Sequence, residues 1–181
     1  MRLLTHFCTI SCSILFINTA KAEEPSIDRG LRVSIVAGCH DCHTEDYRQT
    51  EGKLDPSKTL KGSGIGWRGP WGTTYPTNLR LTADRLNEDG FVLYLSTIRS
   101  LPPMPWYRVR SLDENDVRSL YRYIKSLGPP GKQAPTAVGP DVEPITPFVL
   151  LEPPQSPSGC KRDLDCGVGQ VCGPASQCVA R

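Results

Sequence analysis

The chain lacks a long hydrophobic run and lacks an excess of charge of either sign. Its most apolar stretch, from Leu3 to Ile17, is interrupted by Thr5, His6 and other polar residues, whereas a membrane-spanning helix needs roughly 20 mostly apolar residues. Residues 23–181 hold 19 Lys and Arg (21 less Arg2 and Lys21) against 19 Asp and Glu. This balance gives no support for nucleic acid or an anionic membrane as a partner.

Residues 1–22 have the pattern of a signal peptide. Arg2 precedes an apolar run that includes Ile14–Ile17, and the small residues of Ala20-Lys21-Ala22 suit cleavage before Glu23. The alternative, an uncleaved membrane anchor, is disfavoured by the polar interruptions. We therefore expect a soluble protein exported to the periplasm or a similar oxidising compartment, with no stable membrane insertion after cleavage.

The remaining chain divides by composition into three parts. Residues 23–128 have the mixed composition of one compact domain, and residues 129–159 form a proline-rich extended linker with nine prolines between 129 and 158. Residues 160–181 form a short cysteine-rich tail. Within the linker, Ile145–Leu151 is too apolar for a free tether, so we expect its side chains to dock on the domain.

Helical patterns dominate the predicted domain, and residues 44–84 form a long irregular loop rich in glycine. Three segments pair a capping residue with an apolar face that repeats every three to four residues. The sequence therefore predicts an all-α fold of three to four helices. The caps and faces are Ser26 with Ile27, Leu31 and Ile35; Asn87 with Phe91, Tyr94, Leu95 and Ile98; and Ser111 and Glu114, in capping-box spacing, with Val117, Leu120, Tyr121 and Ile124.

The segment Cys39-His40-Asp41-Cys42-His43 fits the C-x-x-C-H pattern of covalent haem attachment. Two residues between the thiols let both reach one edge of the macrocycle, and the histidine that follows can bind the iron. C-x-x-C also occurs in redox dithiols and zinc sites. The chain shows no α/β pattern around the motif and no second ligand pair with zinc-site spacing, so we predict one covalent haem c, held by Cys39 and Cys42 and ligated by His43.

Met104 is the predicted second axial ligand of the iron. After residue 22 the only histidines are His40 and His43, and His40 lies between the two thiols, where it cannot reach the opposite face of the haem. Met104 is then the only methionine and stands between two prolines. A lone methionine is commonly core filler, but a thioether ligand would raise the reduction potential of a haem iron, as suits an electron carrier.

Residues 26–128 resemble the class I c-type cytochromes, in particular the modules that serve as electron-accepting subunits of bacterial periplasmic dehydrogenases. The resemblance implies that the first and last helices cross and that the loop from Gly72 to Asn78 lies over the haem edge. Thr77 stands where the family usually has proline, and Arg80-Leu81-Thr82 replaces its common Thr-Pro-Asp. The similar motifs are Cys39–His43, Arg29-Gly30, Gly72–Leu79, Pro103-Met104-Pro105-Trp106 and the closing segment Leu112–Leu127.

Other residues are candidates to surround the haem. The second ring nitrogen of His43 needs an acceptor, which the carbonyl of Pro70 or Pro76 could supply. Four aromatic residues could line the haem or donate to its propionates, although buried aromatics more often serve as plain packing. These residues are Trp67, Trp71, Tyr75 and Trp106.

The four cysteines of the tail, Cys160, Cys166, Cys172 and Cys178, are expected to form two disulfides, since an exported chain meets an oxidising compartment. Three pairings are possible, and we favour the alternate one, Cys160 with Cys172 and Cys166 with Cys178. The tail can serve as a stabilising cap or as a docking element.

The predicted function is electron transfer rather than enzyme catalysis. As implied by the resemblance, a dehydrogenase would be the donor, and an oxidase or another cytochrome the acceptor. The alternatives are a haem enzyme, such as a peroxidase or sulfur-compound oxidoreductase, and a ligand sensor, both with a displaceable Met104. The acidic residues nearest to Met104, Asp113 and Glu114, lie at a predicted helix start, which leaves no acid–base pair beside it.

Overall fold

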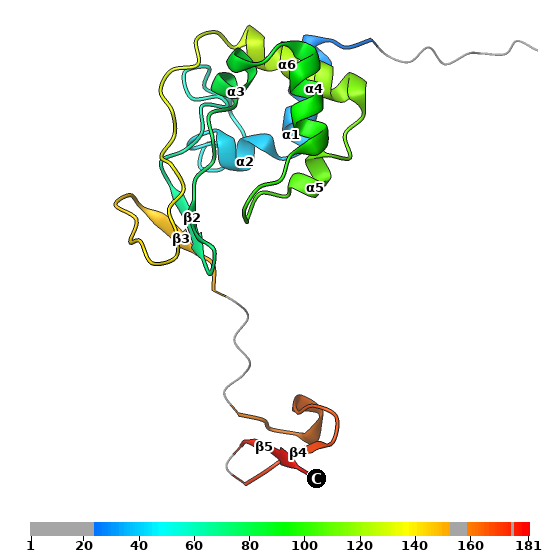
Figure 1. Cartoon of the computed structure of the whole chain (residues 1–181), viewed down its shortest axis with the longest axis vertical. Coiled ribbons are helices and arrows are strands. Elements are labelled where there is room, and N and C mark those ends of the chain that lie inside the picture. Colours follow the sequence, from blue (N-terminus) through cyan, green and yellow to red (C-terminus); the bar gives the residue numbers. More distant parts are fainter. Residues whose placement is uncertain (1–23, 153–158, 175) are drawn as a thin grey trace, which may run out of the picture.

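A computed structural model describes residues 24–152, 159–174 and 176–181 (Figure 1). The predicted signal peptide lies outside these ranges. Within them no helix has the length and apolar character needed to cross a membrane. The helices are α1 (Ile27–Val36), α2 (Cys39–His43), α3 (Leu79–Arg85), α4 (Glu88–Thr97), α5 (Trp106–Val109), α6 (Glu114–Ser126) and the short 3-10 helix η1 (Asp163–Asp165). The strands are β1 (Gly66–Gly69), β2 (Gly72–Thr74), β3 (Phe148–Leu150), β4 (Gln170–Cys172) and β5 (Cys178–Ala180).

The all-α prediction is wrong, because the described residues are 34% helical and 13% strand. β1 and β2 form an antiparallel hairpin, and β3 adds to β1 in parallel, giving the sheet order β2-β1-β3. The hairpin and all of α3 except Arg85 lie inside residues 44–84, so the prediction of an irregular loop is wrong over these elements. Strands of three or four residues are too short to show an alternating pattern, and the partner of β1 lies about 80 residues further along the chain.

Side-chain caps start α1, α3, α4 and α6, whereas α2 and α5 have none. Ser26 accepts a hydrogen bond from the Arg29 amide (3.2 Å) and Asn87 accepts one from the Gly90 amide (2.8 Å), as predicted. The cap of α6 is Asp113, which accepts from the Asp116 amide (2.8 Å). The prediction of Ser111 was wrong, because its hydroxyl donates to the Arg108 carbonyl (2.7 Å) at the end of α5.

The crossing of α1 and α6 uses small side chains. A Cβ atom at Gly30 would lie 2.0 Å from the Ser119 carbonyl oxygen, so only glycine allows this approach. The predicted Ile27/Leu31/Ile35 face is only partly buried: Leu31 packs against the core, but Ile27 and Ile35 are 49% and 45% exposed. The core of the domain lies among α1, α3, α4, α6 and the loop between α2 and β1. It consists of Val33, Leu60, Ala83, Phe91, Leu95, Val117, Leu120, Tyr123 and Ile124.

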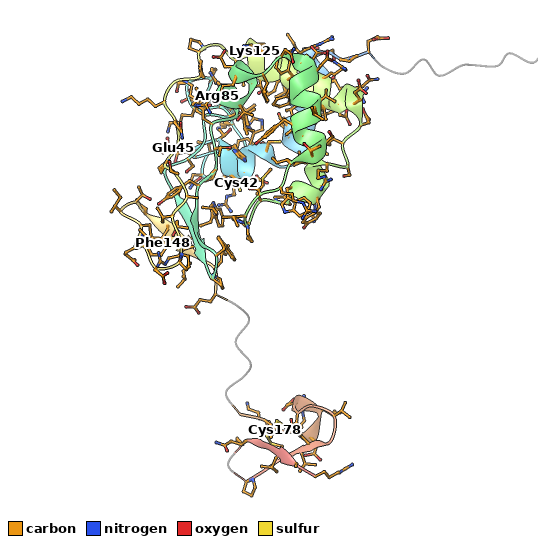
Figure 2. All side chains as sticks on the ribbon, viewed as in Figure 1. Cys42, Glu45, Arg85, Lys125, Phe148 and Cys178 are labelled. Carbon is orange, nitrogen blue, oxygen red and sulfur yellow. A yellow bond between two sulfur atoms is a disulfide. The ribbon has the colours of Figure 1, made fainter. Side chains whose placement is uncertain are left out.

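Residues 129–151, which we call the C-terminal strap, lie along the hairpin of the domain. The Gly66 amide donates to the Pro147 carbonyl (2.8 Å), and the Leu151 amide donates to the Arg68 carbonyl (2.7 Å). Docking of the apolar segment is confirmed, but its expected mechanism is wrong. Ile145 is fully exposed, and Phe148, labelled in Figure 2, is 38% exposed. The strap therefore docks through its main chain, because β1 offers an unpaired edge.

The tail (159–174 and 176–181) is held by cross-links and turns rather than by a core. Disulfides join Cys160 to Cys172 and Cys166 to Cys178, which confirms the alternate pairing. β4 and β5 form a two-stranded antiparallel sheet. Leu164 and Val168 remain 87% and 108% exposed, so apolar burial contributes little to this segment.

Candidate functional site

The two cysteines and the histidine of the C-x-x-C-H segment form a short helix of their own. α1 ends at Val36, and Gly38 turns the chain with a φ of 72°, in the left-handed region that glycine adopts without strain. α2 then begins at Cys39. Residues three and four apart lie on one face of a helix, so Cys39, Cys42 and His43 lie on a common face of α2.

A large cavity brings these residues together with Met104, which lies over sixty positions further along the chain. Its volume is about 1130 Å³, counting the space at its open side. Most of the other lining residues are apolar and come from α3, α4, α5, α6, the hairpin and the loop before α5. They include Leu79, Phe91, Leu95, Ile98, Leu101, Val109, Leu120 and Ile124.

His43 is held so that one ring nitrogen remains available. Its ring is almost fully buried, and Nδ1 lies 2.7 Å from the carbonyl oxygen of Thr77. A carbonyl can only accept, so Nδ1 carries the hydrogen and Nε2 keeps its lone pair. Burial also lowers the pKa of His43, which favours the neutral imidazole that ligates metals.

The acceptor predicted for His43 was wrong. The Pro76 carbonyl, one of the two candidates, instead accepts from the Ser63 amide (3.2 Å). The next carbonyl, that of Thr77, takes its place. Thr77 is one of the positions at which the chain departs from the pattern of the family it resembles. The hydrogen bond to His43 uses the main chain of Thr77 rather than its side chain.

Cys39 and Cys42 are both free thiols. Burial raises the pKa of Cys39 to about 11 and also raises the pKa of Cys42. Redox-active C-x-x-C motifs work through a thiolate of lowered pKa. The shift at this site is in the opposite direction, which disfavours the dithiol alternative.

His40 is fully buried and does not line the cavity. Its Nε2 lies 2.8 Å from Ser34 Oγ and its Nδ1 lies 2.8 Å from Thr44 Oγ1. Thr44 Oγ1 also accepts from the Leu60 amide (2.9 Å). These bonds tie α2 to α1 and to the following loop, a role that its place between two cysteines does not reveal in the sequence.

The loop that carries Met104, residues 98–105 between α4 and α5, is anchored to the hairpin. The Thr74 hydroxyl donates to the Pro102 carbonyl (2.7 Å), and the Trp106 amide donates to the Met104 carbonyl (2.9 Å). Pro103 and Pro105 line the cavity with Met104. The first bond ties the loop to β2, and the second closes a turn between Met104 and the start of α5.

Two of the four candidate aromatics line the cavity, Trp67 and Tyr75, and two do not, Trp71 and Trp106. The Tyr75 hydroxyl lies 2.8 Å from the Thr146 hydroxyl, so the C-terminal strap positions a residue of the cavity wall. Asn78 is a second residue held by the strap, since its side-chain amide donates to the carbonyls of Pro130 (2.7 Å) and Lys132 (2.9 Å). The sequence carries no signal for these contacts of the strap.

Comparison of the chain with models of protein families, with curated proteins and with solved structures found no match. The two disulfides of the tail indicate an oxidising compartment, as expected for an exported protein.

Proposed function

We propose that this protein is an exported monohaem c-type cytochrome that transfers single electrons in the periplasm. The observation that carries the proposal is the meeting of Cys39, Cys42, His43 and Met104 in one largely apolar cavity. The donor set fits a haem c: two thiols to attach the vinyl groups, an imidazole with a free Nε2, and a thioether from a distant loop.

Each of these residues has a defined task in the proposed site. Cys39 and Cys42 would attach the haem, and His43 and Met104 would bind its iron. The haem would supply a metal centre that takes up and releases one electron. The Thr77 carbonyl orients His43 and increases the basicity of its ring, while the apolar lining excludes water and keeps both ligands in place.

The proposed partners are a dehydrogenase that donates electrons and an oxidase or another cytochrome that accepts them. None of the described residues that line the cavity is acidic. General acid–base catalysis needs a carboxylate or a free histidine within reach of the substrate, so the lining supports an electron carrier in preference to a peroxidase or another haem enzyme.

The test is production of the chain in a bacterial host with its haem-attachment machinery. We expect a mass gain of one haem per chain, lost when both Cys39 and Cys42 are replaced by alanine. Recovery of the exported protein with two unmodified thiols would refute the proposal.

Met104→Ala tests the second ligand separately. We expect the weak far-red absorption of a sulfur–iron bond to disappear, the reduction potential to fall, and carbon monoxide to bind the ferrous protein. Rapid binding of carbon monoxide by the parent protein would instead favour a sensor or an enzyme with an open iron position.

A further inference from the structure

The C-terminal strap pairs with the hairpin of β1 and β2 along both of its edges. β3 lies beside β1 in parallel, and on the other edge Val138 exchanges two main-chain hydrogen bonds with Thr73 of β2, both of 2.9 Å. Figure 1 shows the strap, coloured yellow to orange, running from the end of α6 to this hairpin. The hairpin therefore lies between two parts of the strap, and movement away from either part breaks main-chain hydrogen bonds.

Two residues of the hairpin fit this arrangement closely. Gly72 has a φ of 99°, and a Cβ atom there would lie 2.2 Å from the Val138 carbonyl oxygen, so only glycine admits the strap at this edge. The Arg68 guanidinium donates to the Val142 carbonyl (2.8 Å) and forms an ion pair with Glu143 (3.1 Å). These contacts make the strap a built part of the domain.

The segment that the strap encloses holds both proposed ligands of the iron. Thr74 donates its hydroxyl to the Pro102 carbonyl (2.7 Å), which ties down the loop that carries Met104. Three residues further on, the Thr77 carbonyl accepts from Nδ1 of His43 (2.7 Å). The two ligands come from distant parts of the chain, yet one short segment contacts both the imidazole and the methionine loop.

Tyr75 lies between these two contacts in the sequence, and the strap fixes its position. Its ring lines the cavity, and its hydroxyl lies 2.8 Å from the hydroxyl of Thr146. Both side chains are half-buried, and a hydrogen bond away from bulk water is stronger than one in it. Thr146 is not among the lining residues, so its hydroxyl acts on the cavity through Tyr75.

We propose that the strap positions both axial ligands of the iron, with Thr146 as a positioning residue that acts through Tyr75. The inference rests on the proposed function, because it concerns the ligands of a haem iron. Strap contacts at Thr73, Tyr75 and Asn78 precede, divide and follow the segment that holds the ligands. A metal ligand keeps its position when further hydrogen bonds lock the residues behind it. The strap supplies these bonds from outside residues 26–128, the range that resembles the cytochromes.

The test uses the haem-loaded full chain with Thr146→Val, which replaces the hydroxyl by a methyl group. Carbon monoxide binds the ferrous protein only while the Met104 position is open, so its rate of binding measures how often the thioether leaves the iron. Loss of one hydrogen bond changes a population by roughly threefold to tenfold. We expect carbon monoxide to bind Thr146→Val faster than the parent by such a factor. The reduction potential should fall as well, because the thioether ligand raises it.

Two further variants separate positioning from general loosening. Thr146→Ser keeps a hydroxyl that can bond to Tyr75, so carbon monoxide should bind this variant at close to the parental rate. Glu143→Gln is the matched control, because it breaks the ion pair between the strap and Arg68 but leaves the bond to Tyr75 intact. The Glu143 side chain is 74% exposed, and exposed ion pairs contribute little, so its rate should stay within about twofold of the parent.

Amide hydrogen exchange on the same samples gives a second readout, which involves neither carbon monoxide nor electron transfer. The Trp106 amide closes the turn that follows the proposed ligand, so it should exchange faster in Thr146→Val than in the parent or in Glu143→Gln. The Thr73 amide, bonded to the strap, should stay protected in every variant, which shows that the strap is still docked.

Binding of carbon monoxide to Thr146→Val at the parental rate would overturn the inference. Equal acceleration in Glu143→Gln would overturn it too, because general loosening of the strap would then explain the effect. Failure of Thr146→Ser to restore the parental rate would assign the effect to packing at this position and refute the role of the hydroxyl. Each of these outcomes differs from failure of the proposed function, which would appear as an exported parent chain without haem.

Discussion

His40 offers the sharpest test of how α2 is held, because every hydrogen around its ring can be assigned. The Ser34 hydroxyl donates to the Leu31 carbonyl (2.7 Å), so it accepts from His40 Nε2–H. The Thr44 hydroxyl then donates to His40 Nδ1. This network suits the neutral ring, since a second proton on Nδ1 would face the hydroxyl hydrogen of Thr44.

The structure predicts how much acid should destabilise the fold through this residue. Burial lowers the pKa of His40 from 6.5 to about 4. Above pH 6.5 the ring is neutral in both the folded and the unfolded state, so its contribution to stability is complete. Between pH 6.5 and about 4 the unfolded chain takes up a proton that the folded chain does not. The free energy of unfolding therefore falls with decreasing pH, by about 3 kcal/mol in total, and levels off below the folded-state pKa.

The measurement is urea unfolding at pH 7.5 and at pH 4 for the parent and for His40→Gln, which cannot titrate. We expect the midpoint of the parent to fall by about 1.5 M more than that of His40→Gln. The lowered pKa of His43 affects both proteins and cancels in the comparison. Ser34→Ala is the matched control, because it removes one bond to the ring but leaves the ring able to titrate, so its pH dependence should match the parent. Equal pH dependence of the parent and His40→Gln would show that the buried ring is not the acid-sensitive group.

Three other predictions concern stability. Gly30→Ala should lower the free energy of unfolding by about 3 kcal/mol in thermal or urea unfolding, because its Cβ would meet the Ser119 carbonyl. Gly64→Ala is the control: no atom lies within 4 Å of its Cβ, so it should lower the free energy of unfolding by less than about 1 kcal/mol. Similar losses for the two variants would contradict the close crossing of α1 and α6. A chain ending at Gly128 should melt several degrees below one ending at Ser158, since it loses the main-chain pairing of the strap with β1; equal melting would make the strap a simple tether. Reduction of the tail disulfides should increase amide exchange in residues 160–181 and leave the domain unchanged, whereas a lower melting temperature of the domain would show that the tail braces it.

The strap also connects stability with the proposed site. It contacts Tyr75 through Thr146 and Asn78 through two main-chain carbonyls. Asn78 caps α3 by accepting from the Leu81 amide (3.2 Å). Loss of the strap would therefore loosen both the hairpin and the start of α3, which together form one wall of the cavity.

Local signals were sufficient for the helix starts at Ser26 and Asn87, because a cap satisfies amides two or three residues away and depends on little else. They misplaced the start of α6, since Ser111 and Asp113 are both competent caps. Only the chain path decided between them, by placing the Ser111 hydroxyl against the end of α5.

The residues of α1 that meet α6 could not be predicted from the local sequence pattern, for a different reason. Its isoleucines repeat at helical spacing, yet the approach of α6 is so close at Gly30 that small residues, and not the largest apolar ones, meet the partner helix. The strands were missed because the hydrogen bonds that define them join segments up to about 80 residues apart.

The sequence by itself determined the candidate chemistry: the spacing of Cys39, Cys42 and His43, the uniqueness of Met104, and the two tail disulfides. These follow from residue type and short spacing, which require no knowledge of the chain path. The tertiary structure alone decided that Met104 lines the same cavity as the three others, that the Thr77 carbonyl orients His43, and that the strap contacts Tyr75 of the cavity wall. Such relations depend on contacts between distant segments, and these form only when the core and the strap are in place.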